Sequence, residues 1–365
     1  IFLFGLAVFD LWVGVSNDAV NFLNGAVGAK AASFKTVIAI AAVGVFFGCV
    51  LSDGMMDIAR HGIFTPTHFS FNEVMLIYMA VMVTDIVLLD MFNSFGMPTS
   101  TTVSLVFEML GAAFAFTLIK VLGDTGLSFE ECINSAKAVQ VIMGIFFSVP
   151  IAFVFGALVQ YISRIIFSFN LNKGLGLKIG LFGGLAITSI IYFMLFKGLK
   201  HLSFMTDDVV AYINDNVLLI LGCCLVVFTV LSQVLHWLKV NVFRVVVLVG
   251  TFALATAFAG NDLVNFLGVP LAGMSAFQEF SAQAGANPDT YMMTSLMESA
   301  STPFIFLFSA GVIMVVALAT SKKAHTVLKT SLDLSRKNEG DEMFGSSKAA
   351  RSLVRWGNSV GQTVT

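Results

Sequence analysis

Long apolar runs, separated by short polar stretches, recur from one end of this chain to the other. Most of the runs come close to the roughly 20 residues that an α-helix needs to cross the hydrocarbon layer of a membrane. The first and the eighth run contain asparagine, aspartate and glycine, and we expect these two helices to be interrupted. The pattern predicts about nine spans, over 1–30, 36–53, 73–95, 102–122, 139–163, 179–197, 216–237, 241–270 and 301–320.

The composition agrees with a protein embedded in lipid. Hydrophobic residues make up 57% of the chain, charged residues make up 12%, and the mean hydropathy is +0.90. A soluble domain carries about 25% charged residues, and a transmembrane β-barrel alternates apolar and polar positions in short segments. The four cysteines show neither the spacing of metal ligands nor a disulfide framework. The sequence therefore predicts an all-α polytopic membrane protein.

Lysine and arginine set the expected orientation, because loops on the cytoplasmic side of a membrane are enriched in them. The stretch 321–365 is polar and basic, and we expect it to be a cytoplasmic tail. Counting spans backwards from this tail places Arg244, then Arg164 and then Lys30 on the cytoplasmic side. We expect a multi-pass protein of the cytoplasmic membrane that contacts membrane lipid and has no nucleic-acid partner.

Two nearly identical strings lie in the first and eighth runs: Asn17-Asp18-Ala19-Val20-Asn21-Phe22-Leu23 and Asn261-Asp262-Leu263-Val264-Asn265-Phe266-Leu267. They differ at one position and lie 244 residues apart. An aspartate at the centre of a membrane helix costs about 2.5–3.5 kcal/mol on insertion scales, so its repetition suggests an internal duplication. The first helix is expected to run inward and the eighth outward. This arrangement is typical of an inverted-topology repeat with a polar site where the copies meet.

The polar positions of the first string share a helical face, since Asn17, Asn21 and Asn24 are spaced i, i+4 and i+7. Glycines flank both strings and Pro270 ends the second run, which is typical of a broken helix whose freed backbone groups line a cavity. Freed N–H groups suit an anion, whereas carbonyl and carboxylate oxygens suit a cation. The alternative is that the asparagines and aspartates only join helices through hydrogen bonds.

A third element is the string Met97-Pro98-Thr99-Ser100-Thr101-Thr102-Val103. Pro98 prevents an unbroken helix through this point, and four consecutive hydroxyls supply hydrogen-bond donors and acceptors without net charge. Helix capping alone would also explain serine and threonine before an apolar stretch. Four hydroxyls exceed what a cap requires, so we expect a loop tip that binds ligand through Thr99, Ser100, Thr101 and Thr102.

Lysine and arginine are absent from all three strings. An oxyanion bound there would meet amides, hydroxyls and helix ends, together with the carboxylates of Asp18 and Asp262, which repel it. Such a site needs cations to arrive with the anion. We therefore predict cation-coupled uptake in which Asp18 and Asp262 ligate Na+ or carry H+, with no other cofactor and no catalysis.

Four further acidic residues lie near membrane depth, namely Asp10, Asp85, Asp90 and Glu108. Asp10 has no counterpart in the second copy, where Leu254 stands. Asp85 and Asp90 flank the expected end of a helix, so a position at the membrane interface is the alternative for them. Each of the four is an additional candidate for a role in coupling.

The paired Asn-Asp-x-x-Asn strings and the Pro-Thr-Ser-Thr-Thr loop resemble those of the inorganic phosphate transporter family (PiT, also called PHO4). The resemblance extends in organisation from residue 1 to the end of the ninth predicted span. It implies a secondary transporter of inorganic phosphate that is coupled to Na+ or H+ and is often a homodimer. It also implies a substrate site formed by Asn17, Asn21, Asn261 and Asn265 with the hydroxyls of 99–102, beside Asp18 and Asp262.

The chain departs from the family pattern in several places. Val103 stands where many members have histidine, and Val45 stands where many have a glutamate. No second Ser-Thr-Thr loop follows Asn261, and we therefore expect a truncated chain with an incomplete second repeat. The predicted organisation is a first repeat over 1–122, connecting helices over 123–238, an incomplete second repeat over 239–320 and a basic tail over 321–365.

Other functions remain as alternatives. A permease for another tetrahedral oxyanion, sulfate in particular, would need a similar site, although only a phosphate anion can donate a proton to Asp18 or Asp262. A channel would also use broken helices and inverted repeats. An intramembrane enzyme could use the two aspartates as an acid–base pair, but the sequence has neither an HExxH motif nor a Gly-x-Gly-Asp context.

Overall fold

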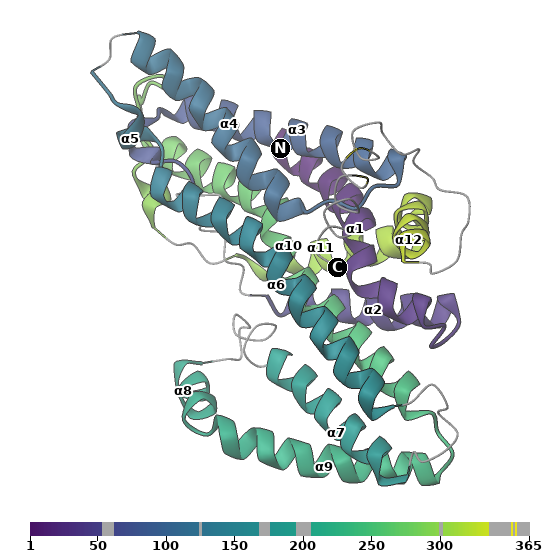
Figure 1. Ribbon diagram of the computed structural model, residues 1–365. Helices are drawn as coiled ribbons and strands as arrows, with labels where there is room; N and C mark the ends of the chain where they lie inside the picture. The colour runs from purple at the N-terminus through teal and green to yellow at the C-terminus, as the bar shows by residue number, and fades with distance from the viewer. Residues whose placement is uncertain are drawn as a thin grey trace.

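The computed structural model describes residues 1–52, 62–123, 126–167, 176–194, 206–298 and 302–335, together with residues 352 and 355. Within these ranges the chain is helical almost throughout (Figure 1). Two short 3-10 helices, η2 (Pro66–His68) and η4 (Ser295–Met297), lie in connecting segments. The α-helices are α1 (Phe2–Gly28), α2 (Phe34–Val50), α3 (Phe71–Phe95), α4 (Thr101–Leu122), α5 (Phe129–Cys132), α6 (Ser135–Ile166), α7 (Gly176–Phe193), α8 (Asp207–Asp215), α9 (Val217–Trp237), α10 (Val242–Ala282), α11 (Phe304–Thr320) and α12 (Lys322–Leu334).

Each predicted span coincides with a helix of the structure, in order α1, α2, α3, α4, α6, α7, α9, α10 and α11. In the described ranges, seven helices are long and apolar enough to cross a membrane. A 65° bend joins α11 to α12, and counting that bent pair as one span gives up to eight. The remaining predicted span, α2, is an apolar helix of 17 residues. The expected polytopic α-helical architecture is confirmed.

The two helices that carry the repeated strings, α1 and α10, pack against each other in opposite directions. Leu3 at the start of α1 touches Gly273 near the end of α10. Towards the other end of the pair, the ring centroids of Phe22 and Phe258 are 6.5 Å apart. The order of contacts along one helix is therefore reversed along the other, as the count of charged loops predicted.

Both motif helices are continuous where interruptions were expected. α1 has no break between Phe2 and Gly28, and α10 continues through Pro270 to Ala282. Glycine in these helices permits close packing instead, since a Cβ added to Gly14 would lie 2.1 Å from the ring of Phe266. The breaks occur in segments packed on the motif helices, at the turn between α3 and α4 and at the α11–α12 bend.

Helix α2 lies along α10 at a very short distance because small residues face each other. A Cβ added to Gly44 would lie 2.7 Å from the carbonyl oxygen of Phe252, and one added to Gly48 would lie 2.3 Å from that of Thr256. One step further along, Ser52 Oγ donates to the Gly260 carbonyl at 3.1 Å. The Gly-x-x-x-Gly spacing of α2 therefore fixes this helix against the one that carries the second string.

We expect Gly48→Ala to lower the melting temperature of the purified protein, because the new methyl group must push α2 away from α10. Overpacking of this kind costs about 1–3 kcal/mol. Gly222→Ala in α9 is the matched control, since a Cβ there meets open space and alanine favours a helix over glycine by about 0.5–1 kcal/mol. Equal melting temperatures for the two variants would contradict the predicted contact.

The helices α3 and α4 form a hairpin that positions the hydroxyl string at its tip. Gly96 ends α3 with φ 67°, a left-handed conformation that glycine adopts without steric cost. Ser100 begins α4 as its cap, accepting a hydrogen bond from the Val103 N–H at 3.3 Å. At the opposite end of the hairpin, Lys120 Nζ lies 2.8 Å from Glu73 Oε2. Both ends of the hairpin are therefore held by polar contacts.

Helices α11 and α12 follow α1 along its length. The rings of Phe4 and Phe306 stack at 5.1 Å between centroids, and Asn24 Nδ2 of α1 donates to Ser331 Oγ of α12 at 3.0 Å. Four residues of α12, Ala324, Val327, Leu328 and Thr330, are buried. The predicted basic tail therefore begins as a packed helix, and most of the rest of it lies outside the described residues.

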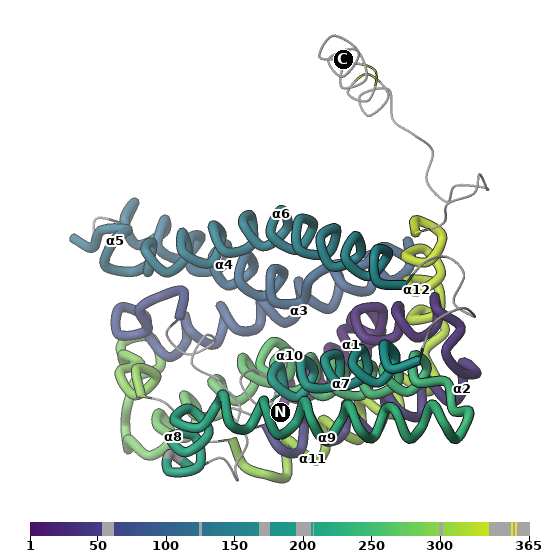
Figure 2. Tube along the Cα trace, turned by 60° about the horizontal axis from the view of Figure 1, so that its bottom comes forward, coloured from purple at the N-terminus to yellow at the C-terminus, as the bar shows by residue number. Residues whose placement is uncertain are grey.

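The other helices lie at the periphery of this group. Figure 2 shows α7 and α9 side by side, and Gly184 of α7 allows Thr229 of α9 to approach closely. Helix α6 exposes large apolar side chains along its length, including Phe146 and Phe153, as suits a helix that faces lipid. The hydrophobic core itself is formed mainly by α1, α2, α3, α4, α10 and α11.

Candidate functional site

Asn17 of the first string fastens the tip of the α3–α4 hairpin to α1. Its Oδ1 accepts a hydrogen bond from the backbone N–H of Thr99 at 2.8 Å. Its Nδ2 donates to the carbonyl oxygen of Met97 at 3.1 Å and to Asn93 Oδ1 at 2.7 Å. The side chain is completely buried. Asn17 is therefore committed to holding the loop, and this contact sets the position of the four hydroxyls.

Thr101 and Thr102 connect the hairpin tip to both repeated strings. Thr101 Oγ1 lies 3.3 Å from Asp18 Oδ2, where it donates a hydrogen bond. From α10, Asn265 Nδ2 donates to Thr101 Oγ1 at 3.1 Å and to Thr102 Oγ1 at 3.0 Å. Asp18 and Asn265 are buried, with 4% and 1% of their surface exposed. The fold thus brings the three strings together in one polar centre.

Asp262 adds a second carboxylate to this polar centre. It is buried, it accepts a hydrogen bond from Asn261 Nδ2 at 3.1 Å, and its charge acts on Asp18 across the contact between α1 and α10. The ion pairs found in the described ranges, Lys120–Glu73 and Lys323–Asp90, involve neither aspartate. Two acidic side chains therefore share a buried site in which the described residues supply no fixed counter-charge.

The predicted site residues differ in how they take part. Asn21 is exposed and makes no hydrogen bond among the described residues, and Asn261 is also exposed although it contacts Asp262. The Ser100 hydroxyl caps α4, as the capping alternative anticipated. Thr99 contributes its backbone N–H, while its side chain is half-buried. Direct contact between the strings is thus made by Asn17, Asp18, Thr101, Thr102 and Asn265.

The polar centre offers two kinds of group to a ligand. The start of α4 presents backbone N–H groups and the positive end of a helix dipole, both of which suit an anion. The two carboxylates and the neighbouring hydroxyl oxygens suit a hard cation. A site with both kinds of group and no basic side chain can hold an anion together with cations better than it can hold an anion alone.

Comparison with known proteins now identifies the family. The sequence model of the phosphate transporter family, PHO4, matches residues 14–330, a range that contains all three strings. The chain belongs to the phosphate transporter family. A solved structure described as "The sodium-dependent phosphate transporter" is similar to this chain, with a TM-score of 0.63 and 18% identity over 90% of this chain and 78% of that one. Among curated proteins, none matches this chain.

Membership of the phosphate transporter family confirms the resemblance noted from the three strings. Phosphate is the substrate of this family, and the many apolar helices make this member a multi-pass membrane protein. Membership of this family points to a transporter rather than an enzyme. The solved structure supports the fold alone, because the two sequences are only 18% identical.

Asn93 is a residue of this phosphate transporter's site that the sequence pattern did not single out. Its Nδ2 donates to the Val13 carbonyl at 2.8 Å while its Oδ1 accepts from Asn17, so it ties α3 to α1 beside the tip. It is buried to 1% exposure. The available signal was a lone asparagine in an apolar run, five residues before Pro98.

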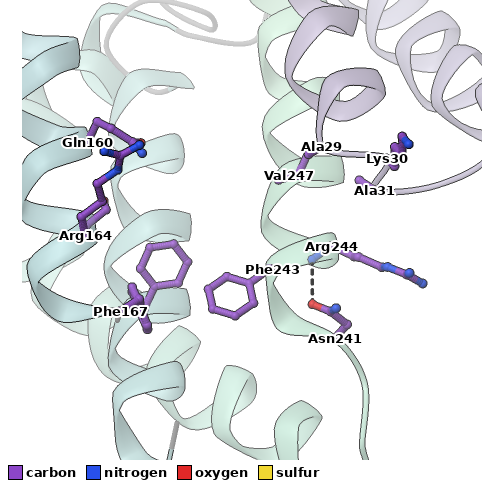
Figure 3. Close-up of a pocket in the computed structure, with 12 residues that line it drawn as sticks. Ala29, Lys30, Ala31, Gln160, Arg164, Phe167, Asn241, Phe243, Arg244 and Val247 are labelled. Atoms are coloured by element: carbon purple, nitrogen blue, oxygen red, sulfur yellow. Dashed lines mark hydrogen bonds between the residues drawn. The ribbon is translucent and has the colours of Figure 1, made fainter. Parts of the chain in front are cut away.

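A separate cavity of the transporter, about 510 Å³ in volume, lies where α1, α6 and α10 approach one another (Figure 3). It is lined by the basic residues Lys30, Arg164 and Arg244 and by an aromatic group that includes Phe167 and Phe243. Figure 3 shows Arg164 on one side of the cavity and Lys30 on the other. No residue of the polar centre lines this cavity, so it is distinct from the candidate substrate site.

Proposed function

We propose that this protein is a Na+-coupled symporter of inorganic phosphate in the cytoplasmic membrane, and that it works by alternating access. The observation that carries the proposal is the polar centre, in which Asp18 and Asn265 from antiparallel helices contact the hydroxyls of Thr101 and Thr102, with the buried Asp262 acting on Asp18. Duplicated helices that meet around a polar site are the common arrangement of secondary transporters.

Phosphate fits the donors at the hairpin tip. Hydroxyl and backbone N–H groups at the start of α4 can donate to its oxygens, and the helix dipole favours its charge. Since HPO4(2−) and H2PO4(−) can also donate a hydrogen bond, they can approach Asp18 or Asp262, whereas sulfate cannot. Selectivity for phosphate over sulfate is therefore expected to arise at the two aspartates.

Na+ is the coupling ion that we propose for the two aspartates. Each added cation offsets the repulsion between the two carboxylates and between them and phosphate. Carboxylate, hydroxyl and amide oxygens are the ligands that hard cations prefer. We propose Na+ rather than H+ because the solved structure with the similar fold is described as a sodium-dependent phosphate transporter.

Alternating access is supported by the way in which the hairpin tip joins the two motif helices. The tip is held to α1 by the hydrogen bond between Asn17 and Thr99, and to α10 by the hydrogen bonds from Asn265 to Thr101 and Thr102. A movement of α10 relative to α1 would break one set of contacts and leave the other intact. Binding of phosphate and Na+ across both sets would then favour the closed arrangement.

We expect proteoliposomes containing the full chain to accumulate labelled phosphate when a Na+ gradient is imposed, and to accumulate little with an equal K+ gradient. An imposed proton gradient without Na+ forms a second arm of the experiment, and labelled sulfate forms a third. Uptake driven by protons alone would reassign the coupling ion. Uptake of sulfate but not phosphate would overturn the proposed substrate, and flux that neither saturates nor depends on an ion gradient would indicate a channel.

A further inference from the structure

A second group of acidic side chains lies outside the polar centre, between α1, α3 and α4. Ser104 Oγ of α4 is 2.5 Å from Asp85 Oδ1 of α3 and 2.7 Å from Glu108 Oε1, one turn further along α4. Asp10 of α1 is completely buried, and the charges of Asp85 and Glu108 act on it. We call Asp10, Asp85 and Glu108 the carboxyl cluster. A group of ionisable residues at this depth suggests a functional site.

The carboxyl cluster contains more short contacts than the Ser104 proton can explain. A hydroxyl has one hydrogen to donate, and an ionised carboxylate can only accept. Both contacts of Ser104 are short enough to require a hydrogen between the oxygens, so Asp85 or Glu108 must carry a proton and donate it.

Asp10 provides an observation that is independent of these hydrogen bonds. Both of its carboxyl oxygens are buried and have no hydrogen-bond partner among the described residues. One further oxygen of Asp85 and one of Glu108 are in the same condition. An ionised carboxylate without any partner is very costly in a buried position. The carboxyl group of Asp10 must therefore carry a proton itself or receive a hydrogen bond from a protonated neighbour.

The charged groups that act on the carboxyl cluster are acidic, and Lys120 of α4 and Lys323 of α12 are paired elsewhere. Asp10 is acted on by Asp85, Glu108 and Asp18. On α3, Asp90 is occupied by Lys323 of α12 at 2.6 Å, and on α4 Lys120 is paired with Glu73 at the far end of the hairpin. From α10, Asp262 acts on Asp18. Among the residues that the structure describes, these pairings leave no basic side chain at the cluster, so we infer that protons neutralise it.

The cluster also has a route for exchange of protons. A cavity of about 570 Å³ lies along α3 and α4 and is lined by Thr99, Ser104 and Glu108. It extends from Thr99 at the hairpin tip to Glu108, a residue that is half-buried as a whole. This cavity is the path that we infer for proton exchange with Glu108.

We propose that Asp10, Asp85 and Glu108 form a proton-binding centre that holds the α3–α4 hairpin against α1. Loss of its protons would place like charges on three neighbouring helices and push the hairpin, with its hydroxyl string, away from α1. The centre would thereby set the pH dependence of transport while Asp18 and Asp262 bind the coupling ion. The effect on transport rests on the proposed function, whereas proton binding itself does not.

The test is the melting temperature of the full chain in nanodiscs across a pH series, for the wild type and for Glu108→Gln. A proton bound only by the folded form makes the unfolding constant rise about tenfold per pH unit, so the wild type should become less stable as the pH rises. Glu108→Gln keeps a hydrogen-bond donor for Ser104 and removes the titrating group, so its profile should be flatter. Glu130→Gln, at an exposed position of α5, should behave as the wild type does.

A second measurement covers the case in which Glu108→Gln does not fold. The infrared carbonyl band of a protonated carboxyl group should be present in the wild type at neutral pH and reduced in Asp10→Asn or Asp85→Asn. A wild-type melting profile no steeper than that of Glu108→Gln, or no protonated-carboxyl band, would overturn the proton-binding centre. If the melting profiles differ as expected but the wild type takes up no phosphate, the proposed function fails and the proton-binding centre stands.

Discussion

Replacing either Asp18 or Asp262 with asparagine is expected to reduce Na+-driven phosphate uptake at least about 100-fold, a loss of about 2.8 kcal/mol at 1.4 kcal/mol per factor of ten. Asparagine has the shape of aspartate, so the contact with Thr101 can persist, but the negative charge that attracts Na+ is removed. The measurement is initial uptake of labelled phosphate into proteoliposomes under a fixed Na+ gradient.

The same variants separate a loss of Na+ binding from a loss of folding. Na+ at about 100 times its Kd should stabilise the wild type by about 2.7 kcal/mol, and this gain should vanish in Asp18→Asn. Without Na+, the variant should melt at or above the wild-type temperature, because one of two like buried charges is gone. Asp90→Asn, which breaks only an exposed pair with Lys323, should retain both uptake and the Na+ effect. A Na+-dependent rise in Asp18→Asn equal to that of the wild type would contradict the coupling role.

Much of the polar centre could be predicted because polar side chains are conspicuous in apolar helices. Asp18 and Asp262 stood out by the cost of placing a carboxylate in a membrane helix, and their repetition predicted that the two strings would meet. The positive-inside pattern predicted that the two copies run in opposite directions. The contacts of Asn265 with Thr101 and Thr102 show the strings in one place. The spacing of the asparagines predicted that they share one helical face, and the hydrophobic pattern predicted the helices that carry them.

The continuity of the motif helices could not be predicted, because glycine has two uses in a membrane helix. It can mark a break, or it can let another helix approach, and only the neighbour decides between them. Gly14 meets the Phe266 ring and Gly48 meets the α10 backbone, so both serve packing. In the same way, the role of Asn93 depends on its contacts with Asn17 and Val13, which are 76 and 80 residues away in sequence.

Three further positions show where local patterns stop being informative. The four consecutive hydroxyls favoured ligand binding by Ser100 over capping, yet its side chain caps α4. The charges of α12 suggested a solvated tail, yet Val327 and Leu328 pack against the body of the protein. Asp10, Asp85 and Glu108 were separate candidates in the sequence, and only the packing of α1, α3 and α4 joins them. Tertiary contacts decide each of these cases.

Asn17→Ala is expected to release the hairpin tip and to lower both stability and transport. The change leaves the Thr99 N–H and the Asn93 amide oxygen without the partner that they have in the wild type. Each buried polar group that loses its hydrogen bond costs about 1–3 kcal/mol. We expect a lower melting temperature and at least about a tenfold loss of uptake, since a misplaced tip no longer presents Thr101 to Asp18.

The measurement is the melting temperature together with hydrogen exchange of the Thr99 amide, which reports directly on the tip. Asn21→Ala is the matched control for stability, since Asn21 lies one turn further along α1, is exposed and makes no hydrogen bond to the hairpin. Its melting temperature and Thr99 exchange should equal those of the wild type. If Asn17→Ala leaves Thr99 protected while uptake is lost, Asn17 contacts the substrate directly and does not act by positioning the hairpin tip. If both variants expose Thr99 equally, the hydrogen bonds of Asn17 do not hold the tip, and the polar centre must be maintained from α10 through Asn265.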